Sequence, residues 1–243
     1  MKISVIIPAH NEEAYILRTL QAILDQSYGD YEVIIVDNVS TDRTFEIVTD
    51  FVRKLEMGGQ SKIIFRVTSE GEKGTMAACE KGRLLSTGDI IARLDADCLP
   101  DSDWLEKAAR IFENEKVVAV SGPYAFYDAG WFFSWSRVWQ QKIILGTANV
   151  FMQWIGKSAV TNGGNSLFRA TTLEAIGGFD RSIVFYGDDT NIAKRMAQQG
   201  KVVFSPTLVM KTSARRFMKE GRVSTQFKYV FHFFKESFSS RNM

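Results

Sequence analysis

The sequence predicts an α/β fold with a mostly parallel central sheet that is flanked by helices. In the first 100 residues, short apolar β-prone runs alternate with segments whose apolar residues recur at helical spacing. The connecting loops are short, as expected when covering helices join parallel strands. Polar residues follow several of the apolar runs directly. Because ligands of such sheets bind at the carboxyl ends of the strands, the same pattern also predicts a ligand-binding site at that edge of the sheet.

The first half contains four expected strands. In order, we expect a strand over Ile3–Ile7, a helix over Glu12–Gln26, a strand over Glu32–Val36, a helix ending near Leu55, a strand over Ile63–Val67, a helix over Gly74–Leu85 and a strand over Ile90–Leu94. Ser40 or Thr41 can cap the second helix. The loop from Pro8 to Glu12 follows the first of these strands, and Asp37 follows the second. All of these residues should therefore lie at one edge of the sheet.

The second half is less regular. We expect a helix over Asp103–Asn114, a strand over Val117–Ser121, a turn over Gly163–Asn165, a strand over Ser166–Phe168, a short helix over Leu173–Ile176, a helix from Gly187 to about Gln199 and a strand over Val202–Phe204. The stretch from Tyr124 to Ile155 is rich in aromatic residues. Two interpretations of it remain open: a core that covers a substrate groove, or a contact with lipid or with a hydrophobic substrate.

Composition limits the class of protein. The chain has 243 residues, 45% of them hydrophobic, which suits one large domain with a buried core. Cys79 and Cys98 are the only cysteines, so no disulfide framework is expected. The first strand pattern begins at residue 3, and no apolar run reaches the length of about 18 residues that a spanning helix needs. We therefore expect a cytoplasmic protein, and no nucleic-acid partner.

The last 33 residues are basic. Residues 211–243 carry eight basic and two acidic side chains, a net charge of +6, which leaves −4 for residues 1–210 of the +2 chain. Several of its apolar residues recur at helical spacing, namely Phe227, Val230, Phe231, Phe234 and Phe238. The tail is thus expected to form an amphipathic helix. It suits a membrane surface, with peripheral attachment at the inner face, and it suits a partner subunit equally.

Asp95 and Asp97 follow the fourth strand, one residue apart. On a strand, residues so spaced share a face, so both carboxylates should point toward the same spot. Two carboxylates so placed repel each other unless a cation lies between them. Hard oxygen ligands suit Mg²⁺ or Mn²⁺, and these ions suit a diphosphate. The pair is therefore a candidate metal site.

Several motifs together resemble the inverting glycosyltransferases of family 2. These motifs are Ser4–Glu13, Val36–Asp42, Leu94–Asp97, Thr161–Arg169, Ile176–Asp180 and Gly187–Thr190. They occur in order between about residues 3 and 216, and six together are hard to obtain by chance. The resemblance implies a GT-A fold, with a Rossmann-like sheet and a smaller acceptor-side sheet. Residues 1–100 would bind the nucleotide sugar, residues 101–210 would form the acceptor half, and residues 211–243 the basic aromatic tail.

The resemblance also implies roles for single residues. Asp37 would accept a hydrogen bond from the nucleotide base, commonly uracil, so a UDP-sugar is favoured. Asp97 would bind Mn²⁺ or Mg²⁺ on the diphosphate, with Asp95 near the ribose and metal. Asp189 would be the catalytic base, with Asp188 beside it where family members usually have Glu. The remaining donor-binding residues would be Pro8, Ala9, Asn11, Glu12, Asn38, Lys73 and Ala96, and the acceptor-binding residues Gly163, Gly164 and Asn165.

The sequence departs from the family pattern at several positions. Asn38 stands where relatives often have a second carboxylate, and Lys73 can supply positive charge toward the phosphates. The extended signature of processive relatives is absent, which favours a non-processive enzyme. Arg215 and Arg216 follow an expected strand and can contact the donor diphosphate or a lipid phosphate, or can be plain surface charge.

Three functions remain open at this stage. The first is hexosyl transfer to an acceptor hydroxyl, with Asp189 as general base and Asp97 holding the metal; a lipid-linked acceptor is one candidate. The second is a sugar-phosphate nucleotidyltransferase, whose sheet is similar but which would have a Gly-rich loop where this chain has Pro8–Glu12. The third is a non-catalytic protein that binds a nucleotide sugar, which would have no need of Asp189.

Overall fold

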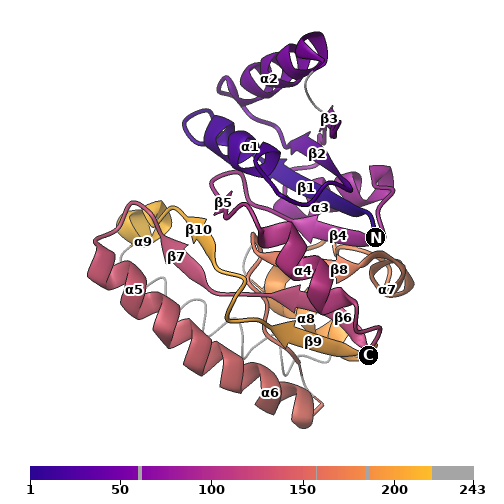
Figure 1. Ribbon diagram of the computed structural model, residues 1–243, viewed down its shortest axis with the longest axis vertical. Coiled ribbons are helices and arrows are strands. Elements are labelled where there is room, and N and C mark those ends of the chain that lie inside the picture. The colour runs from indigo at the N-terminus through magenta and orange to yellow at the C-terminus, as the bar shows by residue number, and fades with distance from the viewer. Residues whose placement is uncertain (60–61, 157, 184–186, 221–243) are drawn as a thin grey trace.

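A seven-stranded sheet forms the centre of the computed structural model, which describes residues 1–59, 62–156, 158–183 and 187–220 (Figure 1). The strand order is β3-β2-β1-β4-β8-β6-β9. The strands are β1 (Ile3–Ala9), β2 (Tyr31–Asp37), β3 (Ile64–Ser69), β4 (Ile90–Arg93), β6 (Val117–Ser121), β8 (Ser166–Arg169) and β9 (Lys201–Phe204). Only β8 runs antiparallel to its neighbours. The mostly parallel sheet expected from the sequence is thereby confirmed.

Helices cover both faces of this sheet. They are α1 (Ile16–Leu24), α2 (Thr44–Gly58), α3 (Thr75–Leu85), α4 (Trp104–Phe112), α7 (Ala170–Ala175) and α8 (Asp188–Ala197). Apolar residues of α1, α2 and α4 pack in one core cluster, and those of α3, α7 and α8 pack in the other. All seven residues of β1 are buried, as are all seven of β2, because a parallel sheet is covered on both faces.

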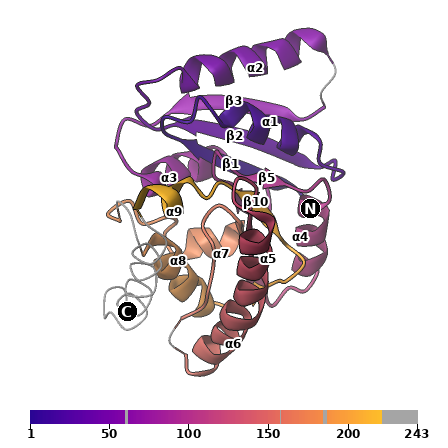
Figure 2. The ribbon, with the colours of Figure 1, turned by 90° about the vertical axis from the view of Figure 1, so that its left-hand side faces the viewer.

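A second sheet of three short strands lies beside the first. Its order is β5-β10-β7, with β5 (Leu99–Pro100), β7 (Tyr124–Phe126) and β10 (Met210–Thr212). Beyond it the chain forms one long helical rod, composed of α5 (Trp131–Gln140), the π-helical turn η1 (Gln141–Leu145) and α6 (Gly146–Trp154). The rod runs along the outside of the molecule, on the opposite side from α2 (Figures 1 and 2). The small sheet was expected, but the path of the rod was not.

Some element bounds differ from expectation. The helix expected from Glu12 begins at Ile16, after a turn in which the Tyr15 N–H donates to the Glu12 carbonyl at 2.9 Å and the N–H groups of Glu12 and Glu13 donate to the side chains of Thr44 and Asp42. Residues 12–15 therefore form a turn at the sheet edge. The amphipathic helix expected around Phe227–Phe238 lies outside the described residues, which end with α9 (Arg215–Glu220). Among the described helices, none has the length and apolar character needed to cross a bilayer.

Candidate active site

The carboxyl ends of β1 and β2 form the first part of the site. Ala9 and Asp37 are paired in register at these two ends. Asp37 is buried, and its Oδ2 accepts a hydrogen bond of 3.3 Å from the backbone N–H of Ser40. Its Oδ1 is also buried, but no described residue donates a hydrogen bond to it. A buried carboxylate oxygen without a donor is costly, so this atom is well suited to accept an N–H from a ligand.

The loop after β1 is attached to the loop after β2. Asn11 has a left-handed backbone with φ of 56°, which Asn tolerates better than most residues. Its N–H donates to Ser40 Oγ at 3.0 Å, and its Oδ1 accepts from the Thr41 N–H at 2.8 Å. Pro8 and Ala9 are buried at the end of β1, so their side chains offer a ligand little surface. These bonds hold both loops in one fixed arrangement beside Asp37.

Asn38 has its amide fully used within the protein. Its Nδ2 donates to the carbonyls of Glu70 and Glu72, at 3.0 and 2.7 Å, and its Oδ1 accepts from the Gly74 N–H at 2.8 Å. The side chain thus fastens the loop before α3 to the end of β2. Lys73 is exposed on that same loop. A contact of either residue with a nucleotide stays a prediction, but Asn38 clearly positions the loop that carries Lys73.

Asp95 and Asp97 do not share a strand face, which corrects the sequence interpretation. β4 ends at Arg93, and the chain then turns, with the Cys98 N–H donating to the Asp95 carbonyl at 3.0 Å. Asp95 is 38% exposed and lies 3.6 Å from Arg93 Nε, whereas Asp97 is only 13% exposed and faces the C-terminal segment. The intervening Ala96 is buried, and its carbonyl accepts from Thr19 Oγ at 2.7 Å. The turn separates the environments of the two acids.

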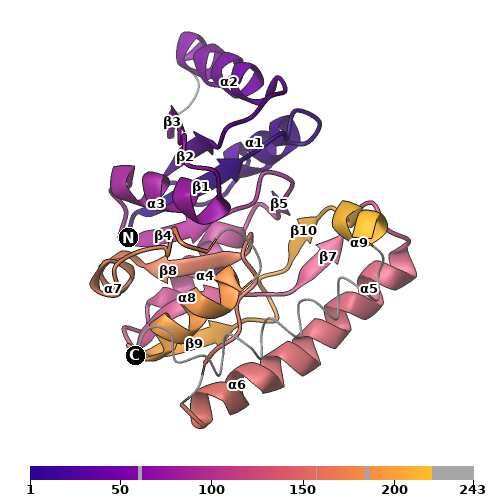
Figure 3. The ribbon, with the colours of Figure 1, turned by 180° about the vertical axis from the view of Figure 1, so that it is seen from behind.

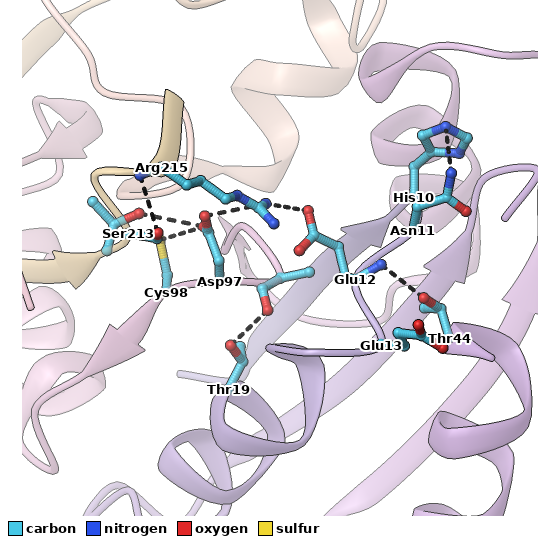
Figure 4. Close-up of polar contacts among 12 residues, drawn as sticks. His10, Asn11, Glu12, Glu13, Thr19, Thr44, Asp97, Cys98, Ser213 and Arg215 are labelled. Atoms are coloured by element: carbon cyan, nitrogen blue, oxygen red, sulfur yellow. Dashed lines mark hydrogen bonds and ion pairs between the residues drawn. The ribbon is translucent and has the colours of Figure 1, made fainter. Parts of the chain in front are cut away.

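Arg215 brings a distant segment to Asp97. Its guanidinium lies 3.2 Å from Asp97 Oδ2, forms an ion pair with Glu12, and stacks over Tyr15 at 4.5 Å from the ring centre. Figure 4 shows this side chain reaching between the two carboxylates. Arg215 therefore supplies the positive charge that two close acids require. Arg216 is exposed on α9. A contact of either arginine with a phosphate stays a prediction.

The acids around Asp97 have the chemistry of a cation site. Burial, and then the negative charge of Asp95, raise the pKa of Asp97 to about 6, even though Arg215 opposes the shift. Glu12 Oε2 is buried without a donor among the described side chains. One guanidinium thus balances only part of the negative charge of Asp95, Asp97 and Glu12, and such a group suits a divalent ion, which typically binds through one or two carboxylates and completes its shell with water and phosphate. In the described part of the chain, no set of three or more ligands forms a complete metal site.

Arg93 joins the two halves of the site. It is a charged residue at the end of the buried strand β4, and its side chain is only 7% exposed. Its Nη1 lies 3.0 Å from Asp188 Oδ2 and 3.1 Å from Asp189 Oδ1. Since Arg93 also contacts Asp95, one guanidinium connects the end of β4 to the start of α8. Arg93 was not predicted as a site residue, although a charge inside an apolar run was a usable signal.

Asp189 has the environment of a proton acceptor. It lies in the first turn of α8, after Gly187, whose φ is 94°. Burial and the charge of Asp188 raise the pKa of Asp189, while Arg93 and a hydrogen bond from the Gly163 backbone oppose the rise. A raised pKa makes a carboxylate a stronger base. The same ion pair with Arg93 fixes the direction in which this carboxylate points.

The turn after residue 162 is packed against these acids. A Cβ added to Gly163 would lie 2.5 Å from Asp189 Oδ1, and one added to Gly164 would lie 2.5 Å from Asp95 Cγ. Both positions therefore need glycine. Asn165 differs, because it is fully buried, accepts from Trp104 Nε1 at 2.9 Å and donates to the Leu208 carbonyl at 2.7 Å. Its side chain positions the turn, and a direct contact with an acceptor stays a prediction.

The comparisons with known proteins agree with this geometry. The chain belongs to glycosyl transferase family 2, because the model of that family matches residues 4–177. It is 29% identical over 210 residues to the probable glycosyltransferase YdaM of Bacillus subtilis, covering 82% of this chain and 47% of the relative. It is 30% identical over 201 residues to the glycosyltransferase AglE of Haloferax volcanii, covering 82% and 62%.

Further relatives and solved structures are similar over most of the chain. The beta-monoglucosyldiacylglycerol synthase of a Nostoc species is 28% identical over 200 residues, covering 80% of this chain and 41% of the relative. The structure of mannosyltransferase PcManGT from Pyrobaculum calidifontis, with GDP-Man and Mn²⁺, matches 97% of this chain and 62% of that one with a TM-score of 0.76 and 24% identity. S. aureus TarS with UDP-GlcNAc matches 88% and 59%, with a TM-score of 0.65 and 18% identity.

These likenesses establish the GT-A fold expected from the sequence. The chain spans about two fifths to three fifths of the length of the curated relatives named above.

Proposed function

We propose that this chain is a metal-dependent inverting glycosyltransferase that transfers a sugar from a nucleoside diphosphate to an acceptor hydroxyl. In this proposal the chain is one GT-A domain, with residues 1–100 binding the donor and residues 101–210 forming the acceptor half. Asp189 is the general base, and Asp97, with Asp95 beside it, holds the divalent ion, Mn²⁺ or Mg²⁺. The observation that carries the proposal is the Arg93 side chain, which contacts Asp95, Asp188 and Asp189 together.

The reaction is a single displacement. Asp189 accepts the proton of the acceptor hydroxyl while that oxygen forms a bond to the anomeric carbon. The bond from the anomeric carbon to the diphosphate oxygen breaks on the opposite side, so the configuration inverts. The leaving nucleoside diphosphate takes the bonding electron pair, and a divalent ion at Asp97 would stabilise this charge as a Lewis acid. Arg93 keeps Asp189 oriented, and Asp188 shares the same guanidinium.

We propose a UDP-sugar as the donor, with a GDP-sugar as the alternative. Asp37 offers a single buried oxygen without a donor, since its other oxygen accepts from Ser40. Uracil presents one N–H at its base-pairing edge, whereas guanine presents two adjacent donors. The two similar structures bind different donors, GDP-Man and UDP-GlcNAc, so both classes belong in the test.

We propose a lipid-linked hydroxyl as the acceptor. The support is the relative named beta-monoglucosyldiacylglycerol synthase, whose name describes a glycolipid product, together with the basic aromatic tail at residues 211–243. The tail itself lies largely outside the described residues, so its contact with a membrane rests on composition.

The experiment measures release of nucleoside diphosphate from UDP-, GDP- and dTDP-sugars with Mn²⁺, Mg²⁺ or EDTA. We expect the wild type to release the nucleoside diphosphate only with a divalent metal, and Asp97→Asn to abolish the release. The control is Asp101→Asn, which replaces an exposed acid paired with Lys211 and should leave the release unchanged. Proton NMR of the product should show the opposite anomer from the donor. Pyrophosphate formation from a nucleoside triphosphate and a sugar phosphate would instead establish a nucleotidyltransferase. Binding of a nucleotide sugar without any turnover would establish the non-catalytic alternative.

A further inference from the structure

The helical rod formed by α5, η1 and α6 has its polar and apolar faces reversed. Its inner side includes the polar residues Ser134, Gln141, Asn149 and Gln153, together with the buried Met152. Its outer side carries large exposed apolar residues, Trp131, Phe132, Trp135, Trp139, Ile143, Ile144, Val150, Phe151 and Trp154. Trp131 is 79% exposed and Trp154 is 80% exposed. A helix on the surface of a protein in water normally has the opposite arrangement.

The inner polar side chains explain how the rod attaches to the protein. Gln141 accepts from the Tyr124 N–H at 3.0 Å and donates to the Tyr124 carbonyl at 2.9 Å, at the edge of β7. Asn149 and Gln153 both donate to the Val202 carbonyl in β9, at 2.9 and 2.8 Å. The rod is thus bonded to the sheet edges by amide side chains, and the exposed apolar residues of its outer side take no part in that attachment.

The outer apolar residues form one stripe along the whole rod. Trp135, Trp139 and Ile143 follow one another at intervals of four residues, and the line continues past η1 through Phe151 to Trp154. Among the described elements, none covers this side of the rod (Figures 1 and 3). A contiguous exposed apolar stripe of this length marks an interaction surface.

The charged residues near the apolar stripe indicate which kind of partner it binds. The sequence has no acidic residue from position 129 to position 173, while the rod itself carries Arg137 and Lys142. The Lys142 ammonium lies 6.0 Å from the centre of the Trp139 ring, beside the stripe. Aromatic residues with basic neighbours and no acids are typical of helices that lie in the interface of an anionic membrane.

The rod also begins next to the candidate active site. Asp128, three residues before α5, accepts hydrogen bonds from Ser213 and Ala214, which directly precede Arg215. The hydroxyl of Tyr127 donates to the Asp97 carbonyl at 3.3 Å. A membrane in contact with the rod would therefore lie close to the acids of the site.

We propose that the outer face of α5, η1 and α6 docks onto the surface of an anionic lipid bilayer, lying in the interface without crossing it. The four tryptophans of the rod enter the headgroup region, and Lys142 contacts lipid phosphates. This orientation brings membrane lipids to the site, and so deepens the proposed function by placing its acceptor. Membrane docking is measured by vesicle binding, and sugar transfer is measured by release of the nucleoside diphosphate. Either proposal can therefore fail while the other stands.

The sequence supplies a direct reporter for the test. Four of the five tryptophans of the chain lie on the rod and are exposed, and the fifth, Trp104, is buried in the core. Tryptophan emission of the full-length protein should therefore shift to shorter wavelength when vesicles containing phosphatidylglycerol are added. Lipids brominated near the headgroup should quench it, and co-sedimentation with the vesicles should give the affinity. Neutral phosphatidylcholine vesicles should bind much more weakly.

Matched variants identify the surface responsible. Trp139→Gln with Phe151→Gln should weaken vesicle binding about tenfold or more, because two apolar anchors are lost. The control, Phe45→Gln with Leu84→Gln, replaces two equally exposed apolar residues on α2 and α3 and should bind as the wild type does. Since all four positions are exposed, both variants should fold, which circular dichroism verifies.

Three results would overturn the proposal. The first is wild-type protein that does not bind anionic vesicles. The second is a rod variant that binds as well as the control, including the case in which only Phe231→Gln with Phe234→Gln in the tail abolishes binding. The third is analytical ultracentrifugation showing a wild-type dimer that the rod variant dissociates while vesicle binding is unchanged, since the stripe would then cover a second copy of the chain.

Discussion

Arg93 shows how a single residue can organise a site. A guanidinium at the end of a buried strand must be paired, and here the partners are Asp95, Asp188 and Asp189. The same contacts place acids that are more than 90 positions apart in the sequence around one point. At the other acid, Asp97, a second arginine has the equivalent role, because Arg215 lies between it and Glu12. Each cluster of carboxylates has its own arginine.

The raised pKa of Asp97 predicts a cost to stability. Its pKa is raised from 3.8 to about 6, so the folded protein binds this proton more tightly than the unfolded chain does. Ionising the group above pH 6 therefore destabilises the fold, and the cost disappears below about pH 4, where both states are protonated. We expect Asp97→Asn to increase the free energy of unfolding by about 1–3 kcal/mol at pH 8 and by almost nothing at pH 4.

Urea unfolding of both proteins in EDTA at the two pH values measures this difference. As a control, Asp101→Asn should change the free energy of unfolding by less than about 0.5 kcal/mol at either pH, since its exposed ion pair with Lys211 contributes little. If Asp97→Asn increased the free energy of unfolding more at pH 4 than at pH 8, the raised pKa of Asp97 would be contradicted.

Gly164 allows a test of packing at the site. A methyl group there would lie 2.5 Å from Asp95 Cγ, so either the turn or the carboxylate must move. We expect Gly164→Ala to lower kcat/KM about 100-fold, because displacements near 1 Å at a reacting centre have effects of this size. Gly29→Ala is the control, since a Cβ at Gly29 has no atom within 4 Å. Equal kcat/KM for the two variants would show that the turn does not touch the site.

At the scale of elements, the sequence was informative wherever a pattern was local. The alternation of β1, α1, β2, α2, β3, α3 and β4 was predicted because parallel strands are apolar runs and their covering helices are amphipathic. The start of α8 at Asp188 also agreed with its acidic first turn. The expected shared face of Asp95 and Asp97 was wrong, because β4 ends at Arg93, one residue before the expected end, and the chain then turns.

The remaining elements depend on contacts that are distant in sequence. β5 has two residues and β10 has three, so neither contains a readable pattern, and their pairing joins residues more than 100 positions apart. The path of the rod was not predicted because polar residues such as Gln141 and Asn149 are buried in it while most of its aromatic residues are exposed, against the rule that apolar residues point inward. Similarly, the burial of Asn165 under Trp104 could not be read from a Gly-Gly-Asn turn.

The polar attachment of the rod predicts the effect of Asn149→Leu. Asn149 is buried, donates to the Val202 carbonyl, and accepts from the Val160 N–H at 2.9 Å. Leucine would leave the buried Val160 N–H without this acceptor, so we expect a loss of about 2–4 kcal/mol in the free energy of unfolding. Val150→Ala, on the adjacent exposed position, should change it by less than about 0.5 kcal/mol. Urea titrations measure both, and equal stabilities would contradict this account of the attachment.

At the scale of the whole molecule, the sheet explains why distant acids meet. Asp37 is the last residue of β2 and Asp95 follows β4, and β1 lies between these two strands, so their carboxyl ends lie at one edge. The antiparallel strand β8 then returns the Gly163–Gly164 turn to the same edge, where α8 begins. The topology thereby gathers the residues that we propose to bind the donor and the acceptor, and the rod places an apolar surface beside them.

The most direct test of the shared cleft compares catalysis and donor binding in Asp189→Asn. If Asp189 is the base at the point where Arg93 joins the two halves, kcat for sugar transfer should fall by about 10²–10⁴-fold. The Kd for the nucleotide sugar with Mn²⁺, measured by calorimetry, should stay within about twofold of wild type, because the donor lies on the side of Asp37 and Asp97. A variant that transfers sugar at the wild-type rate with the same Kd would contradict the account.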